Sequence, residues 1–187
     1  NIINNLTSSF NKDSGVIIEV SSGNNTLENS TFMYNQIYAL HSLSTSGARI
    51  GFSIFQSNLG ALATLRVSGD NNLIYSNLLV NNTLGIGMYL ISGKNFSSFN
   101  NTITNSSSGG SCLSLYGVSN SPRIENNSII NCKVGLAIRF SSNNTLSNFT
   151  IKNGPSASEG VYFNFPDSLP NINFNNSLIN INIINVS

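Results

Sequence analysis

A block of sequence that returns about every 23 residues constrains the fold more than any other feature of this chain. The segment 24–32 (NNTLENSTF) returns at 143–151 as NNTLSNFTI, and weaker copies begin at Asp70, Lys94 and Ser121. The first apolar residue of each copy gives a series of anchors: Ile3, Leu27, Ile50, Leu73, Phe96, Ile124 and Leu146, with an eighth near Leu169 or Ile172. Self-similarity at a fixed period of this length indicates a solenoid.

A second apolar segment follows each anchor and usually begins with glycine, as at Gly15, Gly85, Gly135 and Gly160. Short runs of Ile, Val, Phe and Tyr separated by Asn, Ser and Gly are typical of strands and turns, whereas good helix formers are scarce here. One coil cannot bury its apolar side chains alone, but stacked coils bury a continuous column. We therefore predict an all-β, parallel solenoid of about eight coils forming one domain over residues 1–187.

The composition supports this prediction and excludes several classes of protein. The chain has 34 Asn and 32 Ser, yet only 8% of its residues are charged. Eight scattered Lys and Arg residues make no basic stripe, so we expect no nucleic-acid partner. No apolar run is long enough to span a bilayer, and 40% hydrophobic residues are too many for a disordered chain. Asn at equivalent turns, such as Asn25, Asn71 and Asn144, is expected to adopt left-handed backbone angles and form amide ladders.

The repeat also resembles that of a known family. The unit Asn-Asn-Thr-Leu, then Asn and Ile, then Gly-Ile-x-Leu is similar to the repeat of the pectate-lyase-like right-handed parallel β-helix superfamily. The resemblance is greatest to the Asn-rich repeats of NosD-like proteins and of secreted archaeal and bacterial surface proteins, and it covers the chain from about Ile3 onward. It implies a right-handed β-helix in a periplasmic, secreted or surface setting. It does not imply one function, because the superfamily includes lyases, hydrolases, epimerases, adhesins and fibres.

The acidic residues do not form the pairs that glycoside cleavage needs. Glu28 and Glu125 share the position after the anchor, but they lie four coils apart, or about 19 Å at the strand spacing of a sheet. No cluster of Asp or Glu suggests a calcium site. The remaining charged group is Glu19, His41 and Arg66, which fall at similar offsets in the first three coils. We expect these three to be solvated residues or an ion pair on the outer face, rather than a catalytic patch.

Metal and cofactor sites are not predicted. The chain has one His, two Met and two Cys, and their spacing does not match a zinc or copper site. The two cysteines, Cys112 and Cys132, fall in neighbouring coils. They form either a disulfide in an oxidising compartment or two buried thiols.

Acceptor sites for N-glycosylation are the one dense motif. The sequence Asn-x-Ser/Thr occurs at twelve asparagines: Asn5, Asn24, Asn29, Asn81, Asn95, Asn100, Asn105, Asn126, Asn143, Asn148, Asn175 and Asn185. A chain so rich in Asn, Ser and Thr produces many such motifs by chance. Because we expect them on exposed turns, we predict that some are glycosylated if the protein is secreted.

The two ends of the sequence read as strands without a cap. Segment 178–186 largely alternates Ile and Asn, and the chain begins within the repeat pattern, so it is either a processed product or a segment of a longer chain. Open sheet edges invite further strand pairing. We expect head-to-tail self-assembly, either by end-to-end stacking of coils or by donation of a terminal strand to a neighbour, through Ile2, Ile3, Ile179, Ile181 and Ile183.

Together these features predict a non-enzymatic structural protein of the cell exterior, a subunit of a filament, fibre or surface layer, of archaeal or viral type. The alternative is a carbohydrate-binding or carbohydrate-processing β-helix with polysaccharide as its partner. Six tyrosines could then stack on sugars: Tyr34, Tyr38, Tyr75, Tyr89, Tyr116 and Tyr162. Three or more outward tyrosines in one groove beside clustered carboxylates would favour this alternative.

Overall fold

Three parallel β-sheets wrap around one apolar column in the computed structural model of the chain, which describes residues 1–19, 23–105, 110–153, 159–164 and 175–185. Each coil adds one strand to each sheet, and within the described residues the sheets contain eight, eight and seven strands. The described residues contain no helix, and therefore no helix long and apolar enough to cross a membrane. The predicted all-β parallel β-helix is confirmed.

The strands of the first and second sheets are short. The first sheet consists of β1 (Ile2–Asn4), β4 (Thr26–Glu28), β7 (Arg49–Gly51), β10 (Leu73–Tyr75), β13 (Ser97–Phe99), β16 (Arg123–Glu125), β19 (Thr145–Ser147) and β22 (Ser177–Ile179). The second consists of β2 (Thr7–Ser9), β5 (Thr31–Met33), β8 (Ile54–Gln56), β11 (Leu78–Val80), β14 (Thr102–Thr104), β17 (Ser128–Ile130), β20 (Thr150–Asn153) and β23 (Asn182–Asn185).

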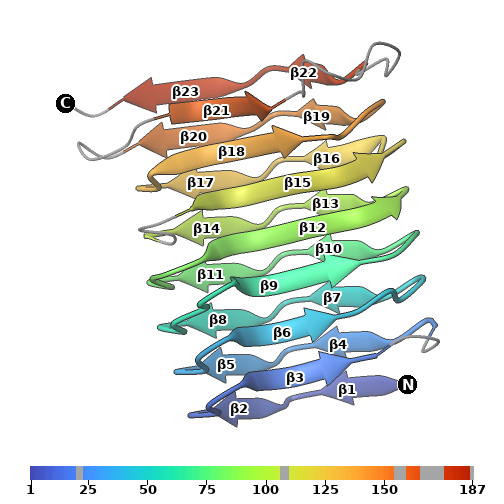
Figure 1. The fold of residues 1–187 in the computed structure, drawn as a ribbon, viewed down its shortest axis with the longest axis vertical. Helices are drawn as coiled ribbons and strands as arrows, with labels where there is room; N and C mark the ends of the chain where they lie inside the picture. Colours follow the sequence, from blue (N-terminus) through green and yellow to red (C-terminus); the bar gives the residue numbers. More distant parts are fainter. Residues whose placement is uncertain (20–22, 106–109, 154–158, 165–174, 186–187) are drawn as a thin grey trace.

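The third sheet has longer strands and faces the viewer in Figure 1. It consists of β3 (Ser14–Ile18), β6 (Tyr38–Ser42), β9 (Ala63–Ser68), β12 (Ile86–Lys94), β15 (Ser111–Ser119), β18 (Val134–Arg139) and β21 (Glu159–Asn164). In Figure 1 these strands run from left to right as the chain climbs, whereas the strands behind them run from right to left. The coil is therefore right-handed.

The interior is a set of in-register apolar columns. In the first sheet, Leu27, Ile50, Ile74, Ser98, Ile124 and Leu146 lie opposite one another on successive strands, and all six are fully buried. In the second sheet, the stacked rings of Phe32 and Phe55 have centroids 4.9 Å apart. Because a one-residue shift would turn every inward side chain outward, this apolar column fixes the register of each strand.

This register corrects two of the predicted anchors. Ile74 and Ser98 occupy the inward column, so Leu73 lies one residue before it and Phe96 two residues before it. Phe96 is nonetheless fully buried, at the corner that precedes the first sheet. In the last coil the column is occupied by Leu178, while Leu169 and Ile172 lie outside the described residues.

Asparagine ladders line the corners, but many of them are inside the coil. Asn35, Asn58 and Asn82 are buried, and each amide group donates from Nδ2 to Oδ1 of the next, at 3.0 Å in both steps. The buried ladders satisfy polar groups of the chain where it turns, which is why so many Asn residues can be tolerated in the interior.

The prediction that Asn25, Asn71 and Asn144 take left-handed angles is correct only for Asn71, with φ of 57°. Asn25 and Asn144 are buried ladder residues, and the residue before each of them, Asn24 or Asn143, has the positive φ. A left-handed residue at each corner leaves the next side chain pointing inward, and Asn adopts this conformation readily.

A disulfide joins Cys112 to Cys132, with the two Cα atoms 5.9 Å apart. Cys112 lies in β15 and Cys132 lies just before β18, so the bond links two successive coils of the third sheet. Both residues are buried. Of the two alternatives left open by the sequence, the structure shows the disulfide.

Candidate functional site

The outer face of the third sheet gathers polar and aromatic side chains from successive coils. Side chains alternate along a strand, so the neighbours of buried residues such as Leu40 and Leu65 point outward. One outward column contains, in chain order, Ile17, His41, Arg66, Tyr89, Ser114, Ala137 and Tyr162. A neighbouring column contains Ser68, Ile91, Tyr116 and Arg139. We call these two columns, together with Tyr38, the third-sheet face.

Aromatic rings and guanidinium groups contact one another along this face. The rings of Tyr38 and His41 have centroids 4.2 Å apart, and Nη1 of Arg66 donates a hydrogen bond of 3.0 Å to the Tyr38 hydroxyl. The Arg66 guanidinium also lies 6.0 Å from the Tyr89 ring centroid. The Tyr89 ring meets that of Tyr116 edge to face at 6.4 Å. Such contacts hold the long side chains in place by cation–π and aromatic attraction.

Four buried side-chain atoms within the described residues have no hydrogen-bond partner, and all four belong to this face. They are Nε2 of His41, Nε of Arg66, Oγ of Ser114 and Nε of Arg139. A buried polar atom without a partner costs about 1–3 kcal/mol, so native proteins have few of them. Their concentration on one face makes the third-sheet face the least completely hydrogen-bonded part of the described residues.

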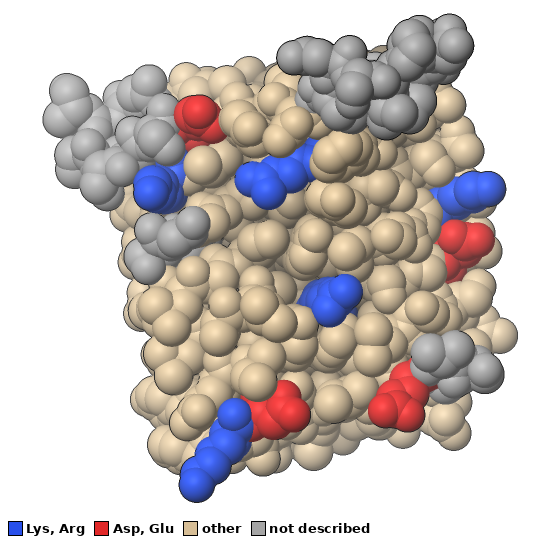
Figure 2. All heavy atoms as spheres, viewed as in Figure 1, with Lys and Arg blue, Asp and Glu red and all other residues tan. Residues whose placement is uncertain are grey.

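The electrostatics of the face are basic. Burial, followed by the nearby Arg66 charge, lowers the pKa of His41 to about 4, so the imidazole is neutral at neutral pH. Burial raises the pKa of Tyr89. Among the described residues, neither Arg66 nor Arg139 forms an ion pair with a carboxylate. In Figure 2, drawn from the same side as Figure 1, the side chains in the middle of this surface are blue, whereas both blue and red side chains lie toward its margins.

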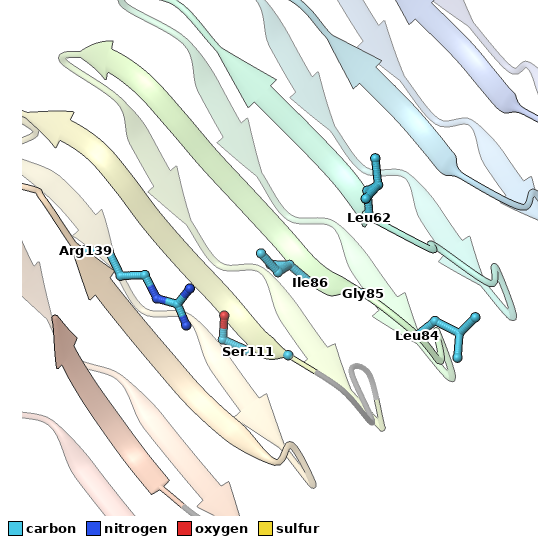
Figure 3. A pocket seen from close by; sticks show the side chains of 7 residues that line it. Leu62, Leu84, Gly85, Ile86, Ser111 and Arg139 are labelled. Atoms are coloured by element: carbon cyan, nitrogen blue, oxygen red, sulfur yellow. The ribbon is translucent and has the colours of Figure 1, made fainter.

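A hollow of about 260 Å³ opens at one edge of the third-sheet face, where the chain enters the third sheet. Its lining includes Leu62, Leu84, Gly85, Ile86, Ser111 and Arg139. Figure 3 shows the Arg139 side chain extending from β18 toward Ser111 at the start of β15, with the three apolar side chains on the other side. The hollow therefore has a cationic wall and an apolar wall.

The outer face of the first sheet, which we call the first-sheet face, contains a second group of charged and aromatic residues. Tyr75 donates a hydrogen bond to Glu28, two coils away, and its ring lies above Gly51 in the coil between them. Burial and this hydrogen bond raise the pKa of Tyr75. At the other end, Arg123 forms an ion pair with Glu125 at 2.6 Å.

Glu28 and Glu125 do occupy one column of the first-sheet face, separated by Gly51, Tyr75 and Phe99. Four strand spacings separate the two carboxylates, about 19 Å, so they do not act together. The described residues contain no group of three or more His, Cys, Asp and Glu that could hold a metal ion.

The predicted charged group is only partly brought together. His41 and Arg66 lie opposite each other on neighbouring strands, but the residue opposite His41 on β3 is Ile17. Glu19 follows the end of β3 and is exposed. The offset from the anchor misplaces Glu19, because the corner between the second and third sheets varies in length from coil to coil.

Sequence reasoning missed Arg139, Ser111 and Ser114. Their signal was present, since Ser114 lies in the same outward column as Arg66 and Tyr89, and Arg139 lies in the neighbouring column. When the fifth coil is aligned on Phe96 instead of Ser98, Ser114 no longer falls at the same distance from its anchor as Arg66 and Tyr89, so the shared column is not apparent. Serine and one arginine also match no catalytic motif, so only their shared position identifies them.

The predicted glycosylation asparagines lie at the corners. All except Asn175 and Asn185 have positive φ and exposed side chains. In most of them the next residue is buried and the Ser or Thr begins a strand, as in Asn29, Ser30 and Thr31. The corner geometry, and not composition alone, therefore produces the motif. Glycosylation itself stays a prediction, and a native mass equal to that of the bare chain would contradict it.

The predicted assembly residues lie on the terminal strands of the stack. Ile2 in β1 is 81% exposed, whereas Ile3 beside it is partly buried. At the other end, Ile179 in β22 and Ile183 in β23 are exposed, and Ile181 packs against the core. Head-to-tail assembly through these residues stays a prediction.

No protein-family model matches the chain, and no curated protein matches it. Among solved structures, the chain is similar to the crystal structure of the periplasmic alginate epimerase AlgG, at 12% identity with a TM-score of 0.35. The match covers 87% of this chain and 46% of the epimerase, so the chain spans about half the length of that protein.

This comparison corrects one expectation. The sequence analysis expects a protein without catalytic activity, but the neighbour that the fold matches is an enzyme. The prediction of a non-enzymatic chain is therefore withdrawn. The likeness is too distant to carry an argument about which activity the chain has.

Proposed function

We propose that the protein binds a polysaccharide along the third-sheet face. The observation that carries the proposal is the row of accessible arginine and tyrosine side chains on this face, whose two arginines form no ion pair among the described residues: Arg66, Tyr89, Tyr116, Arg139 and Tyr162. Binding sites combine apolar and aromatic surface with a few polar groups placed to fix the ligand. Tyr89, Tyr116 and Tyr162 provide the aromatic surface among these polar groups.

The periodicity of the face favours a linear polymer. Stacked strands are about 4.8 Å apart, so an extended chain lying along the coil axis meets a new outward residue at each step. Sugar rings have apolar C–H faces that pack on tyrosine and hydroxyl groups that pair with guanidinium, imidazole and serine. The third-sheet face offers tyrosine and guanidinium groups in five successive coils, from Arg66 in β9 to Tyr162 in β21.

The tyrosines meet one of the two criteria set for this function by the sequence. Tyr89, Tyr116 and Tyr162 are outward on one face, whereas Tyr34 stacks on Phe10 at another corner and Tyr75 belongs to the first-sheet face. Clustered carboxylates, the other criterion, do not accompany them among the described residues. This supports binding more directly than carboxylate-based cleavage.

The disulfide supports a location outside the cytosol. Disulfides persist in secreted and periplasmic proteins and are rare where thiols are kept reduced. The bond between Cys112 and Cys132 lies directly under the third-sheet face, in β15 and before β18. An oxidising compartment is also where extracellular polysaccharides are found.

Affinity electrophoresis through gels containing neutral or acidic polysaccharides tests the proposal. Retardation by at least one polysaccharide is expected, together with its loss in the variant Arg66→Met, Tyr89→Ala. The matched control is Tyr34→Ala, which removes an exposed tyrosine from a corner away from this face. Equal migration of the wild type in every gel would contradict the proposal, as would equal loss of binding in the control.

A further inference from the structure

We propose that the hollow beside Arg139 is a subsite for an anionic substituent, a carboxylate or a sulfate, on a sugar bound along the third-sheet face. This inference rests on the proposed function and adds the chemical class of its ligand. It concerns the edge of the face where the chain enters β12 and β15, away from His41 and Arg66.

The position of Arg139 follows from the small residues beside it. Arg139 ends β18, opposite Tyr116, and the adjacent outward column has Ser114 and Ala137 at this height. Both are small and buried, so they leave room above the sheet between Tyr89 and Tyr162. The Arg139 side chain occupies this room and extends toward Ser111 (Figure 3).

The charge of Arg139 is not neutralised by an ion pair with any of the described residues. Its guanidinium lies 5.4 Å from the ring centroid of Tyr162, and its Nε is buried without a hydrogen-bond partner. Glu159 lies two register steps from Ser111, but it forms no ion pair with Arg139. A guanidinium that lies over an aromatic ring, forms no ion pair among the described residues and lines an open hollow is well suited to bind a planar or tetrahedral oxyanion.

The opposite wall of the hollow identifies the rest of the ligand. Leu62 is 61% exposed and Leu84 is 52% exposed, and Ile86 lies beside them. Exposed leucines beside a cation favour a group whose charge is attached to a carbon framework. A free inorganic anion would contact only the Arg139 side, whereas a charged sugar would also cover the leucines with its C–H edge.

Calorimetric titration with matched probes tests the subsite. The probes are oligogalacturonate and its neutral methyl ester, sulfated dextran oligosaccharide and the unsulfated form, and inorganic sulfate. The variants are Arg139→Gln for the cationic wall and Leu84→Ser for the apolar wall. Arg123→Gln is the matched control, because it removes an arginine that also stacks on an aromatic ring, on the first-sheet face.

We expect the charged oligosaccharides to bind more tightly than their neutral forms, and Arg139→Gln to raise their dissociation constants about tenfold, the loss of one charge-assisted hydrogen bond. Neutral probes should bind both proteins equally. Leu84→Ser should weaken all oligosaccharides and leave inorganic sulfate unchanged. A preference for one of the two charged probes would assign the anion as carboxylate or sulfate.

Two results would overturn the inference in distinguishable ways. Equal binding of charged and neutral oligosaccharides, unaffected by Arg139→Gln, would remove the anionic subsite and leave the proposed function intact. Absence of binding by every oligosaccharide would remove both. Inorganic sulfate that binds as tightly as the charged oligosaccharides, with Leu84→Ser without effect, would show a simple anion site and would also refute the proposal. Unchanged melting temperatures of the variants would show that they are folded.

Discussion

Two outer faces of the coil carry similar residues and differ in how those residues are paired. On the first-sheet face, Arg123 pairs with Glu125, and Tyr75 donates to Glu28. On the third-sheet face, Arg66 and Arg139 contact tyrosine rings but no carboxylate among the described residues. Among the described residues, the buried side-chain atoms without hydrogen-bond partners all lie on the third-sheet face.

The difference lies in pairing and not in composition, and under the proposed function it separates a structural group from a binding group. On the first-sheet face both carboxylates are engaged, Glu125 by Arg123 within β16 and Glu28 by Tyr75 two coils away. Arg49 on the same face lies over the Tyr75 ring and forms no ion pair among the described residues. On the third-sheet face the buried Nε atoms of Arg66 and Arg139 have no partner, and under the proposed function this cost to stability is the consequence of a surface arranged for a ligand. Four variants or conditions test this comparison.

Loss of the disulfide should have the largest effect and should act mainly on the third sheet. The variant Cys112→Ala, Cys132→Ala opens a link between residues 20 positions apart. For a loop of this size we expect the free energy of unfolding to fall by about 3 kcal/mol, because the unfolded chain gains freedom. Chemical denaturation measures the loss. Amide exchange should accelerate more in β15 and β18 than in β13 and β16, and uniform acceleration would contradict the local effect.

Gly51→Ala should disrupt the packing of the first-sheet face and leave the third-sheet face unchanged. A Cβ at this position would lie 2.5 Å from Cζ of Tyr75, so the ring would have to leave Glu28. Overpacking of this kind costs about 2 kcal/mol. Denaturation should show this loss with polysaccharide binding unchanged. The matched control is Gly23→Ala, where the nearest atom is 3.5 Å away. A binding defect in Gly51→Ala would show that the two faces are not independent.

Replacing one arginine on each face should change stability in opposite directions. Arg66→Met removes the unpartnered buried Nε and keeps the apolar stem, but it also loses the hydrogen bond from Nη1 to Tyr38. Because an unpartnered buried donor costs more than one hydrogen bond contributes, the variant should raise the free energy of unfolding by less than about 1 kcal/mol while weakening polysaccharide binding. Arg123→Met breaks an exposed ion pair and should lower the free energy of unfolding by less than about 1 kcal/mol, while polysaccharide binding stays unchanged. Thermal melts and gel retardation measure the two effects. A fall in the free energy of unfolding in Arg66→Met would show that Arg66 stabilises the coil, as the paired residues of the first-sheet face do.

The last prediction concerns pH. The His41 imidazole takes up a proton near pH 6.5 in the unfolded chain and near pH 4 in the folded protein. The unfolded state therefore binds more protons between these values, and stability should rise as pH increases from 4 to 6.5. Melting temperatures measured across this window should be flatter in His41→Gln than in the wild type. Identical slopes would show that the imidazole is not kept neutral by burial.

The sequence predicts the solenoid well because the signal is repeated. Each coil places an apolar residue at the same point of a period of about 23, so single irregular coils do not hide the pattern. Register is harder to predict, because neighbouring positions are also apolar at Leu73 and at Phe96. The structure selects Ile74 and Ser98 for the inward column, since only that choice aligns them with Ile50 and Ile124.

The candidate site is less predictable than the fold. His41 and Arg66 are visible in the sequence as rare charged residues at similar offsets, but Glu19 is misplaced by the variable corner. Ser114 and Arg139 are common residue types whose importance comes from being buried without partners. Pairing depends on atoms from several coils, and no local pattern records it.

The sequence alone determined the parallel β-helix, its approximate period and its low charge, because stacked coils require apolar columns and Asn-rich corners at regular intervals. Only the tertiary structure decided that Cys112 and Cys132 are joined, and that Tyr75 bonds to Glu28 across an intervening glycine. It also decided which arginines remain without a counter-charge. The reason is physical: periodicity is a property of the chain, whereas burial and pairing are properties of side chains brought together by three different sheets.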